Sequence, residues 1–274
     1  MAARSFARAL LLASMLGHGN VHAFSPTSLP FVARPHSRGL APSPIAAAAV
    51  ISPVMTCVVT DMDETLISKK STGYVVSFLV KYRAILRLLL LPLLSATLIP
   101  LSKVSRSLAV RIMYWFAFRG VRVDKANRIA SDFLGEKYAR DLQDPAASAV
   151  LAAESAVIIT ASPTFMARPW LEKYLAVPAA NVYGAELAVR NGRFTGQLMG
   201  AIPIGEAKVE LLKSSVAASA SSTVGYGDHP TDVPFLEACD RGVLVHALPA
   251  DQKGTCEYQP AAPFDLSKLS ALSS

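Results

Sequence analysis

The sequence predicts an α/β fold in which a parallel sheet is interrupted, after its first strand, by a block of helices. Short apolar runs that are typical of buried strands alternate along the chain with segments of helical periodicity. Residues 74–140, which follow the first of these runs, have the patterns of helices. Alternating strands and helices favour one parallel sheet covered by helices.

The expected elements follow one another in a regular order. Four strands are expected, at 54–60, 155–160, 222–228 and 242–247. A β-hairpin is expected at 181–200, because Asn191-Gly192 is a pair typical of tight hairpin turns. Within the helical block, helices are expected at 74–94, 105–120 and 124–142. Further helices are expected at 205–217, at 231–239 and at 162–175, the last with Ser162 as N-cap and Pro163 at its first position.

The first 52 residues have the composition of targeting sequences. Residues 1–23 resemble a signal peptide, with Arg4 and Arg8 ahead of an apolar stretch and a small-residue cleavage site. Residues 24–52 are rich in Ser, Pro and Ala, lack acidic residues and resemble a transit peptide. Because Phe24 directly follows the expected cleavage site, the segment resembles the bipartite presequence of algae with complex plastids. We therefore expect a plastid location, with the secretory pathway or an endomembrane as the alternative.

The rest of the chain is expected to form a core with an inserted cap. Residues 53–70 and 141–260 would form the core, 71–140 an apolar and basic helical cap, and 261–274 a C-terminal tail. With 52% hydrophobic and 17% charged residues, the composition is sufficient for a large core.

The formal net charge of +7 is unevenly distributed, since residues 65–123 hold ten lysines and arginines and no acidic residue. These basic residues alternate with apolar ones, which argues against nucleic-acid binding and predicts peripheral membrane contact through residues 75–120. The uncharged stretch 88–101 is short for a membrane span, which needs about 20 residues. Packing of this stretch inside the cap is the alternative.

Polar side chains lie where three of the expected strands end. Asp61, Asp63 and Thr65 follow the first strand. The other members of this set are Thr160 and Ser162 at the end of the second strand, Asp228 and Asp232 at the end of the third, and Lys208 on the helix before the third. In an open α/β sheet, ligands bind beyond the carboxyl ends of the strands. We therefore expect these side chains to surround one site.

This order of motifs, D-x-D-x-T, then T/S after an apolar strand, then K, then G-D-x-x-x-D, resembles the haloacid dehalogenase (HAD) superfamily. Its members have a Rossmannoid parallel sheet with an inserted cap. The segments "VIITASPTFMARPWLEKYL", "PIGEAKVELL" and "VGYGDHPTDVPFLEAC" are similar to the N-terminal HAD-like domain of land-plant sn-2 glycerol-3-phosphate acyltransferases.

The resemblance implies a phosphatase that forms an aspartyl-phosphate, with Asp61 as nucleophile and Asp63 as general acid and base. It further implies that a phosphate group is bound by Thr65, Thr160, Ser162 and Lys208. Several carboxylates facing a phosphate require a cation, so Mg²⁺ is expected at Asp61, Asp228, Asp232 and, through its backbone carbonyl, Asp63. The expected substrate is a phosphomonoester such as glycerol-3-phosphate or a lysophosphatidic acid-like lipid.

One position departs from the usual pattern of these phosphatases, because Glu64 stands where glycine is common.

Two other functions remain as alternatives. One is a soluble phosphatase for a small metabolite such as phosphoserine. The other is a stand-alone HAD-like module that partners an acyltransferase. Phosphate release from different esters would separate the three.

Overall fold

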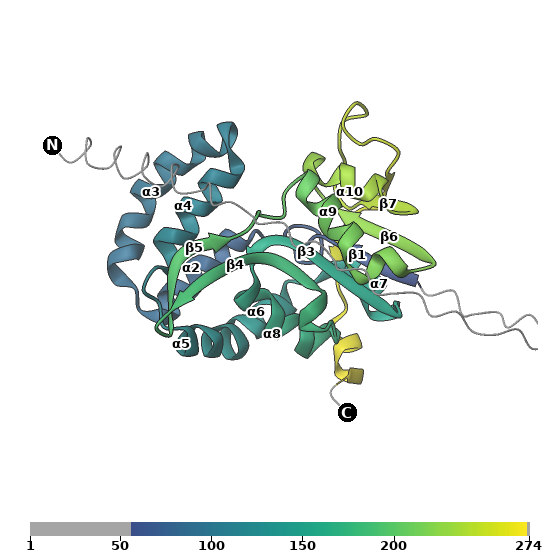
Figure 1. The fold of residues 1–274 in the computed structure, drawn as a ribbon. Coiled ribbons are helices and arrows are strands. Elements are labelled where there is room, and N and C mark those ends of the chain that lie inside the picture. Colours follow the sequence, from purple (N-terminus) through teal and green to yellow (C-terminus); the bar gives the residue numbers. More distant parts are fainter. Residues whose placement is uncertain (1–55, 273–274) are drawn as a thin grey trace, which may run out of the picture. The chain divides into compact units, whose positions relative to one another are not determined.

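The computed structural model describes residues 56–272, and its main feature is a seven-stranded sheet (Figure 1). The strand order is β5-β4-β3-β1-β6-β7-β8. The strands of this sheet are β1 (Thr56–Thr60), β3 (Ser155–Pro163), β4 (Val182–Arg190), β5 (Arg193–Met199), β6 (Ser222–Gly227), β7 (Arg241–Leu244) and β8 (Glu257–Tyr258). The expected signal peptide at 1–23 and the transit-like segment at 24–52 lie outside the described residues.

All neighbouring strands in this sheet are parallel except β4 and β5, which form the expected hairpin. Asn191 and Gly192 both have positive φ at its turn, as a tight hairpin requires. The predicted α/β fold is therefore confirmed. β1 lies at the centre, with β3 on one side and β6 on the other, so the order of the strands reverses there. Ligands of open α/β sheets bind at such a switch point.

The segment between β1 and β3 is helical, but its helices differ from the expected ones. The helices of this segment are α2 (Ser71–Tyr82), α3 (Ile85–Val104), α4 (Arg106–Phe118), α5 (Val123–Arg128), a π-helix η1 (Ile129–Leu134), α6 (Gly135–Arg140) and α7 (Ala146–Ala152). The single helix expected at 74–94 is wrong, because Arg83 adopts a left-handed conformation with φ 65° that ends α2.

The next helix, α3, is longer than the uncharged sequence stretch suggested. It has 20 residues and continues through Pro92 and Pro100. Its length and composition are sufficient to cross a membrane. In Figure 1, α3 and α4 lie beside each other, away from α9 (Glu206–Ser214) and α10 (Val233–Glu237).

The start of the helix after β3 also differs from expectation. α8 (Thr164–Leu175) begins one residue later than predicted, with Pro163 rather than Ser162 as N-cap. The chain remains extended through Pro163, which pairs with Ala185 of β4. Ser162 therefore stays in β3, and its side chain is available to the site described below.

Two clusters of buried apolar residues cover the two faces of the sheet. Successive side chains of β1 point to opposite faces of the sheet, so β1 contributes to both clusters. Val58 belongs to one cluster, while Cys57 and Val59 belong to the other. The first cluster includes Phe78 of α2, and the second includes Phe235 of α10. The end of the chain packs as well: Phe264 is buried in the first cluster, next to a small sheet formed by β2 (Gln143–Asp144) and β9 (Ala262–Pro263).

Candidate active site

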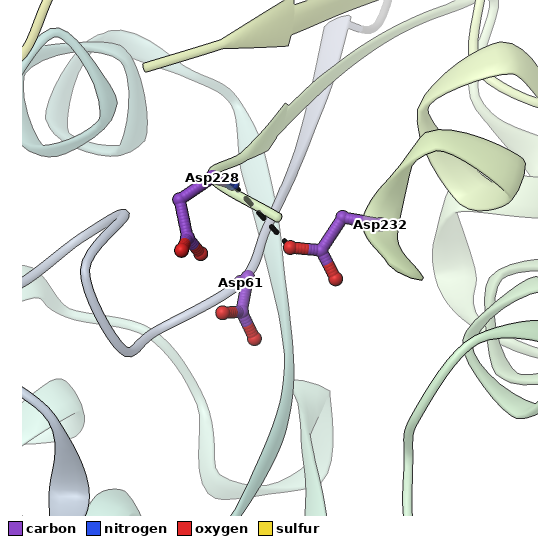
Figure 2. Close-up of side chains that lie close together, drawn as sticks. All are labelled: Asp61, Asp228 and Asp232. Atoms are coloured by element: carbon purple, nitrogen blue, oxygen red, sulfur yellow. Dashed lines mark hydrogen bonds between the residues drawn. The ribbon is translucent and has the colours of Figure 1, made fainter. Parts of the chain in front are cut away.

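Three carboxylates meet at the carboxyl ends of β1 and β6. Ligand oxygens of Asp61, Asp228 and Asp232 all lie within 4.8 Å of one another. Figure 2 shows the three side chains converging from separate segments of the chain. Asp61 is fixed there because its backbone N–H donates to the carbonyl of Tyr226 at 3.0 Å. The grouping expected for these three residues is thus present in the structure.

A buried ammonium group connects two of the carboxylates. Lys208 Nζ lies 2.7 Å from Oδ1 of Asp61 and 2.7 Å from Oδ1 of Asp232. The lysine comes from α9, which begins after Gly205. It is only 4% exposed, so its charge is fully committed to this cluster. Burial acts to lower the pKa of Lys208, but Asp61 and Asp232 outweigh this effect and raise the pKa above its ordinary value.

The turn after β6 holds Asp232 against the other carboxylates. Oδ2 of Asp232 accepts bonds from the backbone N–H groups of Asp228 at 3.4 Å and His229 at 3.3 Å. Gly227 makes this approach possible, since a Cβ there would lie 2.8 Å from Cβ of Asp232. This explains why glycine precedes the aspartate in "GYGD".

Two of the predicted phosphate-binding residues, Thr65 and Thr160, have hydrogen bonds to protein groups. The hydroxyl of Thr65 donates to Oδ1 of Asp228 at 3.0 Å, so it orients one of the clustered carboxylates. The hydroxyl of Thr160 accepts the backbone N–H of Ser162 at 3.1 Å, and Thr160 is buried within β3. Its own proton remains available for a ligand at the same edge of the sheet.

The side chain of Asp63 is not part of the three-carboxylate group. Its Oδ2 accepts the backbone N–H of Ser71 at 2.8 Å, and its Oδ1 accepts the Ser71 hydroxyl at 2.5 Å. The hydroxyl of Ser162, a third predicted phosphate-binding residue, lies 3.3 Å from the same Oδ1. Burial raises the pKa of Asp63, while the bonds from Ser71 act in the opposite direction.

The loop between Asp61 and Thr65 is held by two residues that the sequence motifs did not indicate. The side-chain amide of Gln143 donates to the carbonyls of Glu64 at 2.7 Å and Thr65 at 3.0 Å. A ring nitrogen of His246 lies 3.1 Å from the same Glu64 carbonyl. Gln143 is buried in β2, but its sequence neighbours Asp141 and Asp144 are polar as well, so the local pattern does not mark it.

Burial and the charges of neighbouring carboxylates raise the pKa values of Asp61 and Asp228. Burial, opposed by Lys208 and reinforced by the neighbouring carboxylates, raises the pKa of Asp61 from 3.8 to about 8. Burial and the charge of Asp232 raise the pKa of Asp228 to about 6. One ammonium group therefore does not balance the three carboxylates.

The cluster fits a hard divalent cation. Mg²⁺ prefers carboxylate and carbonyl oxygens, and Asp61, Asp228 and Asp232 offer these atoms within a small space. A cation between them would neutralise the charge that Lys208 leaves unbalanced. The cation would also supply a positive charge for an anionic ligand at the same edge of the sheet.

Comparison with known proteins agrees with this geometry. The model of the haloacid dehalogenase-like hydrolase family matches residues 58–237 of this chain. Glycerol-3-phosphate acyltransferase RAM2 of Petunia hybrida is 29% identical over 195 residues, which are 69% of this chain and 40% of the acyltransferase. The predicted similarity to plant acyltransferases is therefore confirmed, for a chain that spans well under half the length of that relative.

Solved structures share the fold. A protein of unknown function from Bordetella pertussis Tohama I superposes with a TM-score of 0.60 at 20% identity, covering 78% of this chain and 99% of that one. A substrate-bound phosphoserine phosphatase complex gives a TM-score of 0.52 at 14% identity, covering 80% of this chain and 98% of the other. The matched family model, the sheet order and the three-carboxylate group lead to one conclusion: this chain belongs to the haloacid dehalogenase-like hydrolase family.

Proposed function

We propose that this hydrolase is a Mg²⁺-dependent phosphatase that cleaves phosphomonoesters through an aspartyl-phosphate. The observation that supports this most directly is the ion pair between Asp61 and Lys208, next to two further carboxylates. A buried carboxylate held by an ammonium group, beside oxygen ligands for a cation, is suited to attack phosphorus rather than to serve as a surface charge.

The proposed reaction has two steps. An oxygen of Asp61 attacks phosphorus, the bond between phosphorus and the ester oxygen breaks, and Asp63 gives its proton to the departing oxygen. The products of this step are an alcohol and the aspartyl-phosphate. Water then attacks the phosphorus, Asp63 takes the proton of that water, and inorganic phosphate leaves as Asp61 is restored. Lys208 and Thr160 would stabilise the phosphoryl oxygens in both steps.

The proposed substrate is a glycerol-3-phosphate or lysophosphatidic acid-like monoester. Support comes from the similarity to a glycerol-3-phosphate acyltransferase and from the surface of α3. α3 has no buried residue, and Leu86, Leu89 and Leu93 are each at least 70% exposed. Twenty residues of helix measure about 30 Å, which is the thickness of a bilayer's hydrocarbon core. Such a helix favours a substrate that resides in a membrane.

The basic residues near α3 divide into two groups. Arg87 donates to the carbonyl of Ala117 at 2.7 Å, which joins α3 to α4. Arg111 of α4 donates to the carbonyl of Gly200 at 2.7 Å, which fastens α4 to the residue after β5. Arg83, Lys103 and Arg106 are exposed near the ends of α3. The latter three are the residues that we propose to contact anionic headgroups.

Phosphate release tests the proposal. The full chain in detergent micelles with Mg²⁺ is offered lysophosphatidic acid, glycerol-3-phosphate and phosphoserine, beside an Asp61→Asn control. We expect release from the glycerol esters, fastest from the lipid, and none from the control. A preference for phosphoserine would favour the soluble metabolite phosphatase. No release, together with copurification of an acyltransferase, would favour the binding module.

Flotation with vesicles tests the membrane contact. The double variant Leu89→Glu/Leu93→Glu places two charges on the exposed face of α3, and Val216→Glu places one at an exposed site elsewhere. We expect the wild type and Val216→Glu to float with vesicles containing anionic lipid, and the α3 variant to stay in solution. Flotation of the α3 variant at the wild-type level would rule out this surface.

The proposed location is a plastid membrane, on the basis of residues 1–52 alone. A fluorescent protein fused after residue 52 should enter plastids in an alga with complex plastids. Accumulation in the endomembrane system would favour the secretory alternative.

A further inference from the structure

Asp63 lies at the start of the helical segment as well as at the end of β1. Its Oδ2 accepts the backbone N–H of Ser71, the first residue of α2, at 2.8 Å. The residue before it, Lys70, makes no side-chain cap to this helix. The carboxylate of Asp63 therefore takes the place of an N-cap for α2, satisfying an N–H group that has no partner within the helix.

The hydroxyl of Ser71 adds a second bond to the same carboxylate. It donates to Oδ1 of Asp63 at 2.5 Å and also contacts the hydroxyl of Ser162. Ser71 is 4% exposed and Ser162 is 1% exposed, so water does not compete for these bonds. Ser71 belongs to the helical segment and Ser162 to β3 of the sheet. Asp63 is thus held between the two parts of the fold.

A second helix of the segment is attached next to the same strand end. Tyr114 of α4 donates its hydroxyl to the backbone carbonyl of Ala161 at 3.0 Å. Two helices of the segment, α2 and α4, therefore contact the end of β3 directly. Their position determines the position of Ser71 relative to Ser162.

We propose that Ser71 is a positioning residue, which holds the carboxyl group of Asp63 in the orientation needed to protonate the leaving oxygen. This inference rests on the proposed phosphatase function. It assigns to α2 a part in the chemistry that is separate from substrate choice. Without the Ser71 hydroxyl, Asp63 keeps the backbone bond at Oδ2, but its Oδ1 retains only the longer 3.3 Å contact with the Ser162 hydroxyl.

The expected effect depends on the leaving group. In the first step, the bond from phosphorus to the ester oxygen breaks while a proton passes from Asp63 to that oxygen. An alkoxide such as that of glycerol-3-phosphate needs this proton, whereas a nitrophenolate leaves without it. A misplaced acid therefore slows the first ester far more than the second.

The test compares Ser71→Ala with wild type on glycerol-3-phosphate and p-nitrophenyl phosphate, both with Mg²⁺. General acid catalysis contributes about 10²- to 10⁴-fold, and we expect Ser71→Ala to lose at least ~10-fold in kcat on glycerol-3-phosphate. We expect less than ~2-fold loss on the nitrophenyl ester and little change in KM for either. Ser71→Thr retains a hydroxyl and should recover most of the lost rate. Ser77→Ala is the control and should behave as wild type, because it removes a hydroxyl of the same helix that bonds Gly73 and Lys137 and does not contact Asp63.

Each other outcome has a definite meaning. An equal loss of kcat on both esters, or no recovery by Ser71→Thr, would show that Ser71 has a structural role. Either result would overturn the role proposed for Ser71 and leave the proposed phosphatase function standing. If the wild type releases phosphate from neither ester, the proposed function itself fails. Thermal unfolding gives a readout besides activity: Ser71→Ala and Asp63→Asn should be non-additive in the double variant, and additivity would contradict the coupling.

Discussion

Lys208 Nζ lies 2.7 Å from Oδ1 of Asp61, and this bond joins residues 147 positions apart in the sequence. The same ammonium group bonds Asp232 at 2.7 Å. The ammonium group of Lys208 thus links β1, α9 and the turn after β6. The side chains of Asp61, Lys208 and Asp232 are all buried. Removal of the ammonium group would leave carboxylates facing one another without compensation.

We therefore expect Lys208→Met to lose both stability and activity. Removing one partner of a buried ion pair costs about 3–5 kcal/mol in the free energy of unfolding, and added Mg²⁺ should recover part of it. Phosphate release should fall at least ~100-fold. Chemical denaturation with and without Mg²⁺ measures the first effect. Lys213→Met, at an exposed position of the same helix, is the matched control. Equal stability of the Lys208 and Lys213 variants would contradict the expectation.

Binding of Mg²⁺ should depend on pH. With a pKa of about 8 for Asp61 and about 6 for Asp228, the metal-free site holds protons near neutrality that a cation must displace. The apparent affinity for Mg²⁺ should rise as pH increases through this range, with release of protons. Titration calorimetry in buffers of different ionisation enthalpy measures both. An affinity that does not change with pH would count against these two carboxylates as ligands.

The pKa values of Asp61 and Asp228 also predict how the stability of the metal-free protein changes with pH. Their pKa values in the folded protein are raised above 3.8, so the folded state binds more protons than the unfolded state between these values. The free energy of unfolding of the metal-free protein should therefore decrease as pH rises toward about 8. Denaturation with a chelator present, at a series of pH values, measures this dependence. A free energy of unfolding that increases with pH would contradict the raised pKa values of Asp61 and Asp228.

Glu64 should tolerate glycine better than alanine. Its φ of 57° lies in the left-handed region, which glycine adopts without the Cβ penalty. Its ion pair with Lys70 is exposed and contributes little. We expect Glu64→Gly to be more stable than Glu64→Ala by about 1 kcal/mol. The two variants remove the same charge, so urea denaturation isolates the backbone effect. A less stable glycine variant would exclude strain at this position.

Gln143 should be needed for the loop that carries the catalytic pair. Gln143→Leu removes the donor shared by the Glu64 and Thr65 carbonyls, and leaving buried carbonyls with fewer partners costs about 1–3 kcal/mol. Phosphate release should fall with stability, since the loop holds Asp61 and Asp63. Gln252→Leu, at an exposed position, controls for the substitution itself. Unchanged thermal unfolding of Gln143→Leu would show that water replaces the amide.

The strand ends were predictable from the sequence because a buried parallel strand has a strong local pattern. Since parallel strands end at one edge of a sheet, the sequence alone predicts one site that contains Asp61, Lys208, Asp228 and Asp232. The partners of Thr65 and Ser162 could not, because a hydroxyl bonds whatever group the fold brings near it. Ser71 had no motif of its own.

The helical segment was less predictable for physical reasons. Arg83 adopts a left-handed conformation and thereby ends the expected helix. Helices usually end in this way at glycine, so an arginine gives no sign of the helix end. α3 continues through two prolines, which the sequence rules treat as helix breakers, in a helix that buries none of its residues. Local propensity does not include the surroundings that stabilise such a helix.

The central position of β1 has a consequence for biosynthesis. β1 is made first among the described strands, but its neighbour β6 begins only at Ser222. At about 5–20 residues per second, the apolar edge of β1 would wait roughly ten to thirty seconds for this partner to leave the ribosome. Thr65 and Asp228, 163 residues apart, meet only then. The nascent chain therefore carries one unpaired edge of an apolar strand for this time, and acquires its acidic centre among the last steps of folding.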